Sequence, residues 1–410
     1  MVVKSLLRKV REKMKRFVIA GCGARGIFAY AVPIIKKYRD EVLLCGVYDT
    51  NKKRATLVSK YTSEDIPVFD SFEKMLEEAN PDTVIVTTVD RYHDKYVVAA
   101  LNAGCDVIVE KPLTTTFKKS LAILEAQRAS GKKVAVTFNL RFHDFFIKLK
   151  EVVSEGAVGE IYSIHYEWRV DRNHGSSYFR RWHSERENSG SLLVHKSTHH
   201  FDIANWILGQ DPVSVNAFGT RRYFGKGNGE YEGERCLTCK YKDKCEYYYE
   251  MTPTEKELYL ECEDEDGYLR DRCIYSDKVD IEDNVSVSVL YSKGAVMSYT
   301  FNANSPYEGM RMVINGSKGM IEADNVKKMI RIIDNYGKET LVDLTKKAET
   351  GHGNADSEIL HNLIFGKEND SLSQMADIRA GMMSIGIGMA ANISMKEKRR
   401  VMLDEYYKDI

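Results

Sequence analysis

The stretch "RFVIAGCGARGIFAYAVP" (Arg16–Pro33) joins a short apolar run to a helix-like segment through three glycines. Gly21 permits a tight turn, Gly23 lets a ligand approach the backbone, and Gly26 lets a helix pack closely on a strand. The start of the following helix offers free N–H groups and a partial positive charge to phosphate groups. The pattern predicts a strand–turn–helix unit that binds a dinucleotide. A glycine turn of another α/β fold is the alternative.

Chain length and charge restrict the classes of protein to be considered. The chain has 410 residues, which exceeds the roughly 250–300 residues that one hydrophobic core usually supports, so we expect two domains. The 60 Lys and Arg residues balance the 60 Asp and Glu residues, and no apolar run approaches the ~20 residues that span a bilayer. We therefore expect a small-molecule ligand, and neither nucleic acid nor membrane as a partner.

The N-terminal residues, "MVVKSLLRKVREKMKR" (Met1–Arg16), are rich in Lys and Arg. We interpret residues 1–14 as a basic N-terminal extension, either a solvated or subunit-contacting helix or residues that precede an internal start at Met14. A helix on a membrane surface is a further alternative. The segment lacks the roughly 7–15-residue apolar stretch of a signal peptide, and we expect a cytoplasmic protein.

Short apolar runs alternate with helix-like segments over residues 15–138. They are nearly continuous in apolar residues, as parallel strands covered on both faces should be. The expected strands are Arg16–Ala20, Glu41–Val47, Thr83–Thr88, Asp106–Glu110 and Lys133–Phe138. This alternation predicts a doubly wound parallel sheet, and hence a Rossmann dinucleotide-binding domain over residues 15–138.

The pattern changes after about residue 155. Longer runs such as "VSVSVLY" and "AVMSYTFNA" alternate apolar and polar residues, which is typical of an antiparallel sheet with one wetter face. We expect residues 139–410 to form an α+β domain for substrate binding and oligomer contact. A segment rich in Cys, Tyr and acidic residues, at about 221–280, reads as an insertion into it.

The end of the second expected strand carries an acidic residue, Asp49. A carboxylate there can accept hydrogen bonds from both ribose hydroxyls and would repel a 2′-phosphate, which favours NAD over NADP. The cations at Arg25 and Lys52–Arg54 argue the other way, because they could hold a phosphate. A helix cap is the alternative role for Asp49.

A second stretch, "DVIVEKPLTTT", places Glu110, Lys111 and Pro112 after a buried strand. Together with the glycine turn it resembles the Gfo/Idh/MocA family of sugar and inositol oxidoreductases. "VTTVDRYH" is also similar to a family stretch, although Val89 stands where proline is common. The resemblance covers nearly the whole chain from about Lys15. It implies that the cofactor is contacted by Gly21, Gly23, Ala24, Arg25, Gly26, Asp49, Thr88, His93, Glu110 and Lys111.

The resemblance also implies that Lys111 lies beside the nicotinamide and the substrate carbon. An ammonium group there can hydrogen-bond to the alcohol and stabilise its developing alkoxide. Burial would lower the pKa of this lysine toward a range useful for acid–base chemistry. The alternative is a lysine in solvent at the end of a strand.

The segment "HKSTHHFD" (His195–Asp202) is expected to supply the groups that move the proton. By resemblance, His199 takes the position of the family's histidine, and His195 stands where a catalytic aspartate is usual. We expect His199 to act as general base, with Lys196 and His195 as modifiers. Asp202 would fix a histidine tautomer or cap a helix.

Two other readings concern the same region. The histidines of this region could together bind zinc, or their ring nitrogens could be hydrogen-bonded within the protein core. They are His183, His195, His199 and His200. Aromatic and cationic residues upstream suit a carbohydrate, and a carboxylate- or phosphate-bearing sugar is an alternative. The residues expected to contact substrate are Arg169, Tyr178, Arg181 and Trp182.

The insertion contains a Cys-x2-Cys pair with further cysteines. This spacing indicates a structural zinc site, and a subgroup of the resembling family carries such an insertion. Unliganded thiols, an iron–sulfur cluster and disulfides are the alternatives. The expected ligands are Cys236, Cys239, Cys245 and Cys273.

These observations together predict an NAD-dependent dehydrogenase. It would transfer hydride between nicotinamide and a secondary hydroxyl of a sugar, polyol or glycoside. One alternative is a redox glycoside hydrolase or lyase, which oxidises a sugar hydroxyl only transiently. Another is a nucleotide-binding protein without catalysis. The resemblance implies a homodimer or homotetramer.

Overall fold

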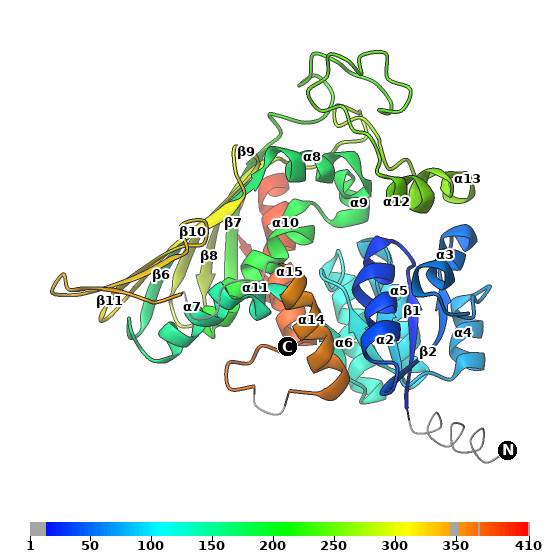
Figure 1. The fold of residues 1–410 in the computed structure, drawn as a ribbon. Helices are drawn as coiled ribbons and strands as arrows, with labels where there is room; N and C mark the ends of the chain where they lie inside the picture. Colours follow the sequence, from blue (N-terminus) through cyan, green and yellow to red (C-terminus); the bar gives the residue numbers. More distant parts are fainter. Residues whose placement is uncertain (1–13, 345–351, 368–369, 409–410) are drawn as a thin grey trace.

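The computed structural model describes residues 14–344, 352–367 and 370–408, which form two halves (Figure 1). The basic extension predicted for residues 1–14 lies outside the described residues, apart from Met14. Within the described ranges, no helix is both long and apolar enough to cross a membrane.

The N-terminal half is built on a six-stranded sheet with the order β14-β5-β4-β3-β1-β2. Its parallel strands are β1 (Lys15–Ala20), β2 (Val42–Tyr48), β3 (Thr83–Val86), β4 (Asp106–Val109) and β5 (Val134–Val136). The edge strand β14 (Ala376–Asp377) comes from the far end of the chain and pairs antiparallel with β5. The predicted doubly wound sheet is therefore confirmed, with one short antiparallel addition.

Helices cover both faces of this sheet. Several begin where a polar side chain accepts the N–H of the residue three positions later, as at Asn51, Ser71 and Thr116. Such caps satisfy N–H groups that the helix itself leaves free. The helical segments are η1 (Gly26–Ala31), α2 (Val32–Lys37), α3 (Lys52–Thr62), α4 (Phe72–Ala79), η2 (Asp90–Tyr92), α5 (His93–Asn102), α6 (Phe117–Ser130) and η3 (Asn139–Phe142).

The second half contains a nine-stranded sheet with the order β13-β12-β11-β10-β6-β9-β8-β7-β15. All its neighbours are antiparallel except β6 and β9, so the mainly antiparallel sheet is confirmed. Burial alternates along β8 and β9, which leaves one face of the sheet wet. The strands are β6 (Ile161–Asp171), β7 (Pro212–Thr220), β8 (Asn284–Tyr291), β9 (Val296–Ser305), β10 (Gly309–Gly316), β11 (Gly319–Asp324), β12 (Met329–Asp334), β13 (Glu339–Leu341) and β15 (Val401–Met402).

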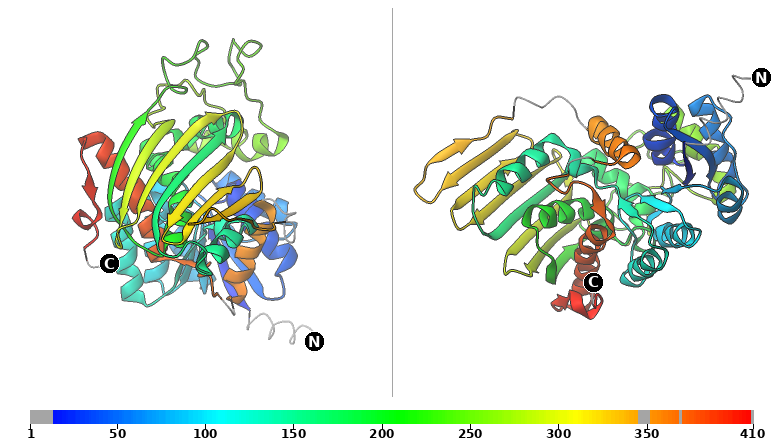
Figure 2. Two further views of the ribbon diagram at one scale, coloured as in Figure 1. Left: turned by 90° about the vertical axis from the view of Figure 1, so that its left-hand side faces the viewer. Right: turned by 90° about the horizontal axis from the view of Figure 1, so that it is seen from below.

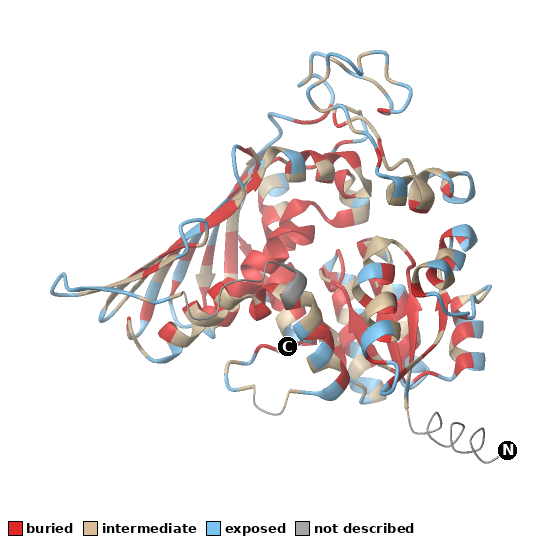
Figure 3. Ribbon diagram, viewed as in Figure 1, coloured by how far each residue is buried: buried red, intermediate tan, exposed pale blue. Residues whose placement is uncertain are grey.

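The helices of the second half lie behind one face of the large sheet (Figure 2), and buried residues gather where the two layers meet (Figure 3). They are α7 (Asp144–Ser154), α8 (Arg172–Arg180), η4 (Trp182–Ser184), α9 (Arg186–Ser189), α10 (Leu192–His195), α11 (Ser197–Leu208) and α15 (Ile378–Glu397). Further helical segments are α12 (Pro253–Glu255), η5 (Lys256–Leu260), α13 (Glu263–Asp266), α14 (His352–Phe365) and η7 (Leu403–Glu405).

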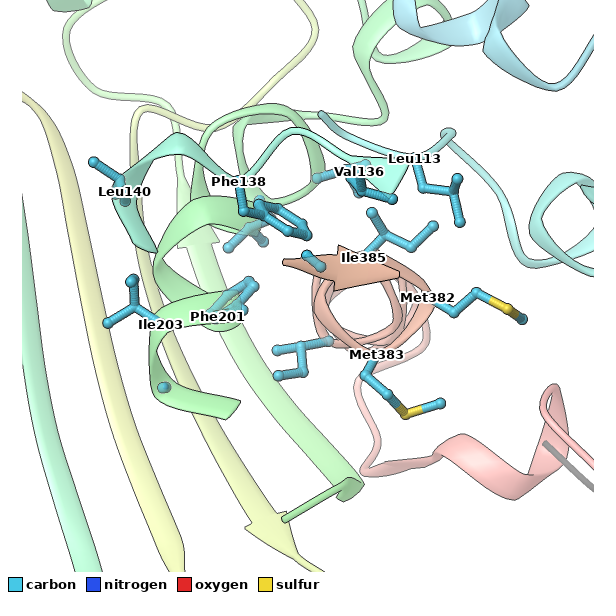
Figure 4. Close-up of a cluster of buried hydrophobic side chains, with 14 of the residues drawn as sticks. Leu113, Val136, Phe138, Leu140, Phe201, Ile203, Met382, Met383 and Ile385 are labelled. Carbon is cyan, nitrogen blue, oxygen red and sulfur yellow. The ribbon is translucent and has the colours of Figure 1, made fainter. Parts of the chain in front are cut away.

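Helix α15 connects the cores of the two halves. Figure 4 shows Ile385 of this helix near Val136 of β5, with Phe201 of α11 beside it. A Cβ on Gly381 would come within 2.9 Å of Val136, and one on Gly388 within 2.4 Å of the backbone of Leu193, so both contacts require glycine. This packing fixes the carboxyl edge of the Rossmann sheet relative to α10 and α11.

Helix α14 belongs to the N-terminal half by its packing. Its Leu360 and Ile364 are buried in one cluster with Phe17 and Ile27. Residues late in the chain therefore complete the covering of the Rossmann sheet.

Candidate active site

A cavity of about 970 Å³ lies between the two halves, beyond the carboxyl ends of the parallel strands. Its size is at the upper end of the ~300–1,000 Å³ typical of ligand pockets. From the N-terminal half, the predicted residues that line it are Gly21, Gly23, Ala24, Arg25, Asp49, Thr88, His93, Glu110 and Lys111. From the second half they are Tyr178, Arg181, Trp182, His195, Lys196 and His199.

The glycine turn leaves an open cradle on the pocket side. Gly21 has a φ of +101°, and a Cβ there would lie 2.6 Å from the backbone of Thr87. A Cβ on Gly26 would lie 2.1 Å from the oxygen of Gly21, so this glycine is required for packing and does not itself line the pocket. Around Gly23 the nearest atom is the Tyr259 hydroxyl at 3.8 Å. The turn therefore has room for a phosphate group where a dinucleotide fold needs it.

Asp49 lines the pocket at the end of β2. Its carboxylate accepts hydrogen bonds from the backbone N–H groups of Cys22 at 2.7 Å and Asn51 at 2.8 Å. Burial raises the pKa of Asp49, and the nearby Arg54 opposes this rise. The helix cap of α3 is Asn51, so the alternative role of Asp49 as a cap is wrong.

Arg25 is held by two acidic partners. Its Nε donates to Glu110 at 2.6 Å and its Nη1 to Asp356 at 2.7 Å. Tyr30 also donates to Glu110 at 2.6 Å. This network ties the helix after the glycine turn to the end of β4, and it occupies one of the cations that could have held a 2′-phosphate.

His93 connects two loops at the edge of the sheet. Its Nδ1 lies 2.8 Å from the Pro112 oxygen and its Nε2 lies 3.1 Å from the Thr88 oxygen. Burial lowers the pKa of His93. A neutral imidazole has one N–H, so the ring donates to one of these two carbonyl oxygens, and His93 lies between the Thr88 and Pro112 segments.

Lys111 follows β4 and reaches across to the second half. Its Nζ donates a hydrogen bond to the backbone oxygen of His195 at 3.2 Å. Burial lowers the pKa of Lys111 to about 8, although Asp90 and Glu110 favour its charged form. This is the range in which a lysine can exchange protons near neutral pH.

Asp90 is the residue that the sequence analysis missed. It starts the short helix η2, and its Oδ2 lies 2.6 Å from Nδ1 of His195. Both side chains are buried, with 4% of the Asp90 side chain and 9% of the His195 side chain exposed. Asp90 lies in the "VTTVDRYH" stretch, but no spacing in the sequence links it to His195.

Burial shifts the pKa values of Asp90 and His195 in opposite directions. It raises the pKa of Asp90 and lowers the pKa of His195, and Lys111 lowers both. Because Nδ1 of His195 is engaged by the carboxylate, Nε2 is the ring nitrogen that a ligand can reach. A histidine oriented by a carboxylate is a common arrangement for proton transfer.

His199 lines the same pocket but has a different environment. Its Nδ1 is buried without a hydrogen-bond partner, and its ring packs edge-on against Phe138 at 6.0 Å. Burial lowers its pKa well below the usual value. The four-residue spacing to His195 predicts that the two rings share one helix face, but α10 ends at His195 and α11 begins at Ser197, so the two rings lie on separate helices.

Two residues of the same segment point away from the pocket. His200 is stacked on Trp168 with ring centroids 3.9 Å apart, and its Nδ1 lies 2.7 Å from the Tyr299 hydroxyl. Asp202 forms a buried ion pair with Arg141 at 2.6 Å. Asp202 therefore neither fixes a histidine tautomer nor caps a helix, and His200 is held in the core.

The residues expected to contact substrate divide into two groups. Tyr178, Trp182 and His183 form an aromatic wall, in which the Trp182 and His183 rings are stacked with centroids 3.7 Å apart. Arg181 lies against the Tyr178 ring at 5.6 Å. Arg169 is elsewhere: it pairs with Glu167 and Tyr307 and does not line the cavity. Its position on β6 gives no support to a substrate role.

Lys196 sits at the break between the two helices. Its Nζ is 3.6 Å from Glu308, which also accepts a hydrogen bond from His174 at 2.6 Å. Among the described residues, the one group of three with spacing suited to a metal ion is Asp171, His174 and Glu308.

The insertion reaches the pocket, which the sequence did not indicate. Its contribution to the lining consists of Tyr259, Asp266, Tyr268 and Arg270. Among the described residues, which include all four predicted cysteine ligands, the sulfurs do not form a group of three within 4.8 Å. Cys236 Sγ instead accepts a hydrogen bond from Arg180 at 2.9 Å. The zinc site therefore stays a prediction.

Comparison with known proteins identifies the two halves. Residues 15–138 match the NAD-binding Rossmann fold of an oxidoreductase family, and residues 150–403 match its C-terminal alpha/beta domain. The Bacillus subtilis (strain 168) protein YteT, which is named as an oxidoreductase, is 35% identical over 96% of this chain and 99% of its own.

Shorter matches involve dehydrogenases. D-glucoside 3-dehydrogenase of Escherichia coli (strain K12) is 31% identical over 46% of this chain and 54% of its own length. Inositol 2-dehydrogenase 2 of Saccharopolyspora erythraea is 30% identical over 40% of this chain and 45% of its own length.

Solved structures share the fold. An oxidoreductase domain protein of Kribbella flavida superposes with a TM-score of 0.72 at 15% identity, covering 95% of this chain and 99% of that one. An oxidoreductase of Agrobacterium radiobacter, crystallised with NAD+, L-tartaric acid and magnesium, gives 0.67 at 16% identity over 96% and 99%. The family matches confirm the predicted oxidoreductase with an NAD-binding domain, and the chain belongs to the Gfo/Idh/MocA family.

Proposed function

We propose that this oxidoreductase is an NAD-dependent dehydrogenase that acts on a secondary hydroxyl of a sugar, polyol or glycoside. The names of its inositol and glucoside dehydrogenase relatives support this substrate class. The aromatic wall of Tyr178, Trp182 and His183 supports it as well, because sugar rings pack on such surfaces.

The cofactor fits the residues present. The open side of Gly23 suits the pyrophosphate, and the Asp49 carboxylate suits the ribose hydroxyls. NAD, when bound, supplies the hydride acceptor. Because Asp49 disfavours a 2′-phosphate, NAD is the expected cofactor and NADP the weaker one.

The proton is handled by groups of the chain itself. The Lys111 ammonium donates a hydrogen bond to the reacting hydroxyl oxygen and stabilises the negative charge that develops there. Nε2 of His195 accepts the hydroxyl proton as the carbon loses hydride, while Asp90 holds Nδ1 on the other side of the ring. His199 then binds a neighbouring hydroxyl of the substrate.

This assignment differs from the sequence-based expectation of His199 as base. The observation that carries this assignment is that His195 contacts both Lys111 and Asp90 of the N-terminal half. Its backbone oxygen accepts from Lys111 at 3.2 Å, and its ring meets Asp90 at 2.6 Å. His199 has a buried Nδ1 without a partner and so lacks an orienting group.

The test is a spectrophotometric screen for NADH formation with monosaccharides, uronic acids, inositols and glycosides, each repeated with NADP+. We expect net NADH with at least one of them, and loss of that activity in Lys111→Met while the variant still binds NAD+. Release of aglycone without net NADH would instead indicate the redox hydrolase or lyase. Full activity of Lys111→Met would overturn the mechanism.

Two expectations from the sequence accompany this proposal. A structural zinc ion would be held by Cys236, Cys239, Cys245 and Cys273. The antiparallel sheet of the second half would mediate contacts in a homodimer or homotetramer, as the family resemblance implies.

A further inference from the structure

One part of the insertion packs directly on the turn after β2. We call residues 256–270 the insertion arm; it contains η5 and α13, which lie next to α3 (Figure 1). Asn51 Nδ2 donates to the oxygen of Cys262 at 2.7 Å, and Arg54 Nε donates to the oxygen of Leu258 at 3.1 Å. Leu258 is fully buried in the core cluster of the Rossmann half. The arm is therefore built into the dinucleotide domain.

The arm also reaches the phosphate cradle. The backbone N–H of Ala24 donates to the hydroxyl of Tyr259 at 3.2 Å. The Tyr259 hydroxyl keeps its own proton for donation to a phosphate oxygen. The insertion arm thus lines the cofactor side of the cavity.

Arg54 lies between two carboxylates, one from the end of β2 and one from the insertion arm. Its Nη2 is 2.9 Å from Asp266 of the insertion arm, and its Nη1 is 3.7 Å from Asp49. Arg54 is 8% exposed, and all three residues line the cavity. In Rossmann folds, an arginine near the acidic residue after the second strand is the group that accommodates the 2′-phosphate of NADP.

We propose that Asp266 is a cofactor-specificity residue supplied by the insertion. It holds the Arg54 guanidinium in an ion pair, and it adds a second negative charge to the region that a 2′-phosphate would enter. NADP+ would have to displace Asp266 from Arg54 and approach two carboxylates, whereas NAD+ leaves the pair intact. The proposal rests on dinucleotide binding in this cavity, and adds a determinant of which dinucleotide is bound.

A purely structural role for Asp266 would be to dock the arm. Other ion pairs dock it as well, including Lys53 with Asp264 at 2.5 Å and Lys60 with Glu257. Asp264 lies on the same short helix as Asp266, is exposed, and contacts Lys53 rather than Arg54. Asp264→Asn is therefore a matched control that removes an arm contact and one negative charge without releasing Arg54, and the Lys53 that it does release does not line the cavity.

The experiment measures the dissociation constants of NAD+ and NADP+ for the full chain by calorimetry, without substrate. We expect Asp266→Asn to shift the affinity ratio toward NADP+ about tenfold, because one charge beside the phosphate site is removed. Asp266→Glu should retain the preference of the original protein for NAD+. Adding Arg54→Gln to Asp266→Asn should abolish most of the gain in NADP+ affinity. Asp264→Asn should leave the ratio of the NAD+ and NADP+ affinities unchanged.

The outcomes separate this inference from the proposed function. If the unaltered protein binds NAD+ and the ratio in Asp266→Asn does not move, or moves equally in Asp264→Asn, the specificity role is overturned and the dehydrogenase proposal stands. If the unaltered protein binds neither dinucleotide, both are overturned. Circular dichroism of each variant shows that the fold is retained, and Asp266→Ser, which removes the same carboxylate, serves where Asp266→Asn does not fold.

Discussion

The carboxylate of Asp90 meets the imidazole of His195 at 2.6 Å, although 105 positions separate the two residues in the chain. Asp90 starts η2, which follows strand β3 of the Rossmann sheet, and His195 ends α10. The pair therefore forms only when the two halves are docked. It supplies a carboxylate to a histidine that stands where the family resemblance leads one to expect an aspartate.

Replacing Asp90 should impair catalysis more than cofactor binding. Asp90→Asn keeps the shape but removes the charge that orients His195, so we expect kcat to fall about 100-fold while the dissociation constant of NAD+ stays nearly constant. Steady-state kinetics and calorimetry check this on one preparation. If Asp90→Asn is fully active and His199→Asn is inactive, the general base is His199, as the sequence suggested.

The pH profile should report the state of Lys111. Its ammonium form is the hydrogen-bond donor, so kcat/KM for alcohol oxidation should decline as pH rises through about 8, the pKa to which burial lowers this group. Lys111→Arg keeps the charge at all accessible pH values, and any residual activity in it should lack this decline. A rate that climbs steadily to about pH 10 in the original protein would contradict a donor role and indicate neutral Lys111 as base.

The lowered pKa of Lys111 also predicts how the stability of the protein depends on pH. The pKa of Lys111 is about 8 in the folded protein and about 10.4 in an unfolded chain. The unfolded chain therefore binds more protons between these values, and the contribution of Lys111 to stability increases as pH rises from about 8 to about 10. Lys111→Met should be the more stable protein at neutral pH, and its advantage should shrink over that window. Urea denaturation across the window checks the sign, and a growing advantage would contradict it.

The buried ion pair between Asp202 and Arg141 is expected to contribute to the stability of the folded protein. Both side chains are buried, with 1% and 6% exposed, and Asp202→Asn would leave the guanidinium without its countercharge. We expect a loss of about 3 kcal/mol in the free energy of unfolding. The matched control is Asp211→Asn, which removes an exposed pair with Arg379 and should cost less than about 1 kcal/mol. Equal losses in both variants would contradict the buried role.

The cysteine prediction can be checked by metal analysis. A protein purified under reducing conditions should carry about one zinc per chain, and Cys239→Ser with Cys245→Ser should lose it. Because the insertion also provides the arm over the cofactor cavity, these variants should bind NAD+ more weakly. A preparation without zinc, whose NAD+ affinity is unaffected by the substitutions, would favour unliganded thiols.

The parts of the fold that depend on local patterns could be predicted. The five apolar runs of the first half became strands, because buried parallel strands have a continuous apolar character. The cofactor side of the site followed from them: the glycine turn, Asp49 and Lys111 all lie at strand ends, and parallel strands bring those ends to one edge.

Features that depend on distant pairing could not be predicted. Nothing near Asp90 identifies His195 as its partner, and nothing in the Cys-rich segment shows that Asp266 would meet Arg54. Arg169 shows the reverse error. Its proximity in sequence to the aromatic residues suggested a substrate contact, but on strand β6 it pairs with Glu167 instead.

The packing of α15 has a consequence for how the protein folds. Its side chains contact both β5 and α11, and the adjoining strand β14 pairs with the edge of the Rossmann sheet. Without this last stretch of chain, Val136 and Phe201 would both lose apolar neighbours. Because α15 and β14 complete the packing of both halves, we expect that the Rossmann half does not fold by itself and that the two halves unfold together.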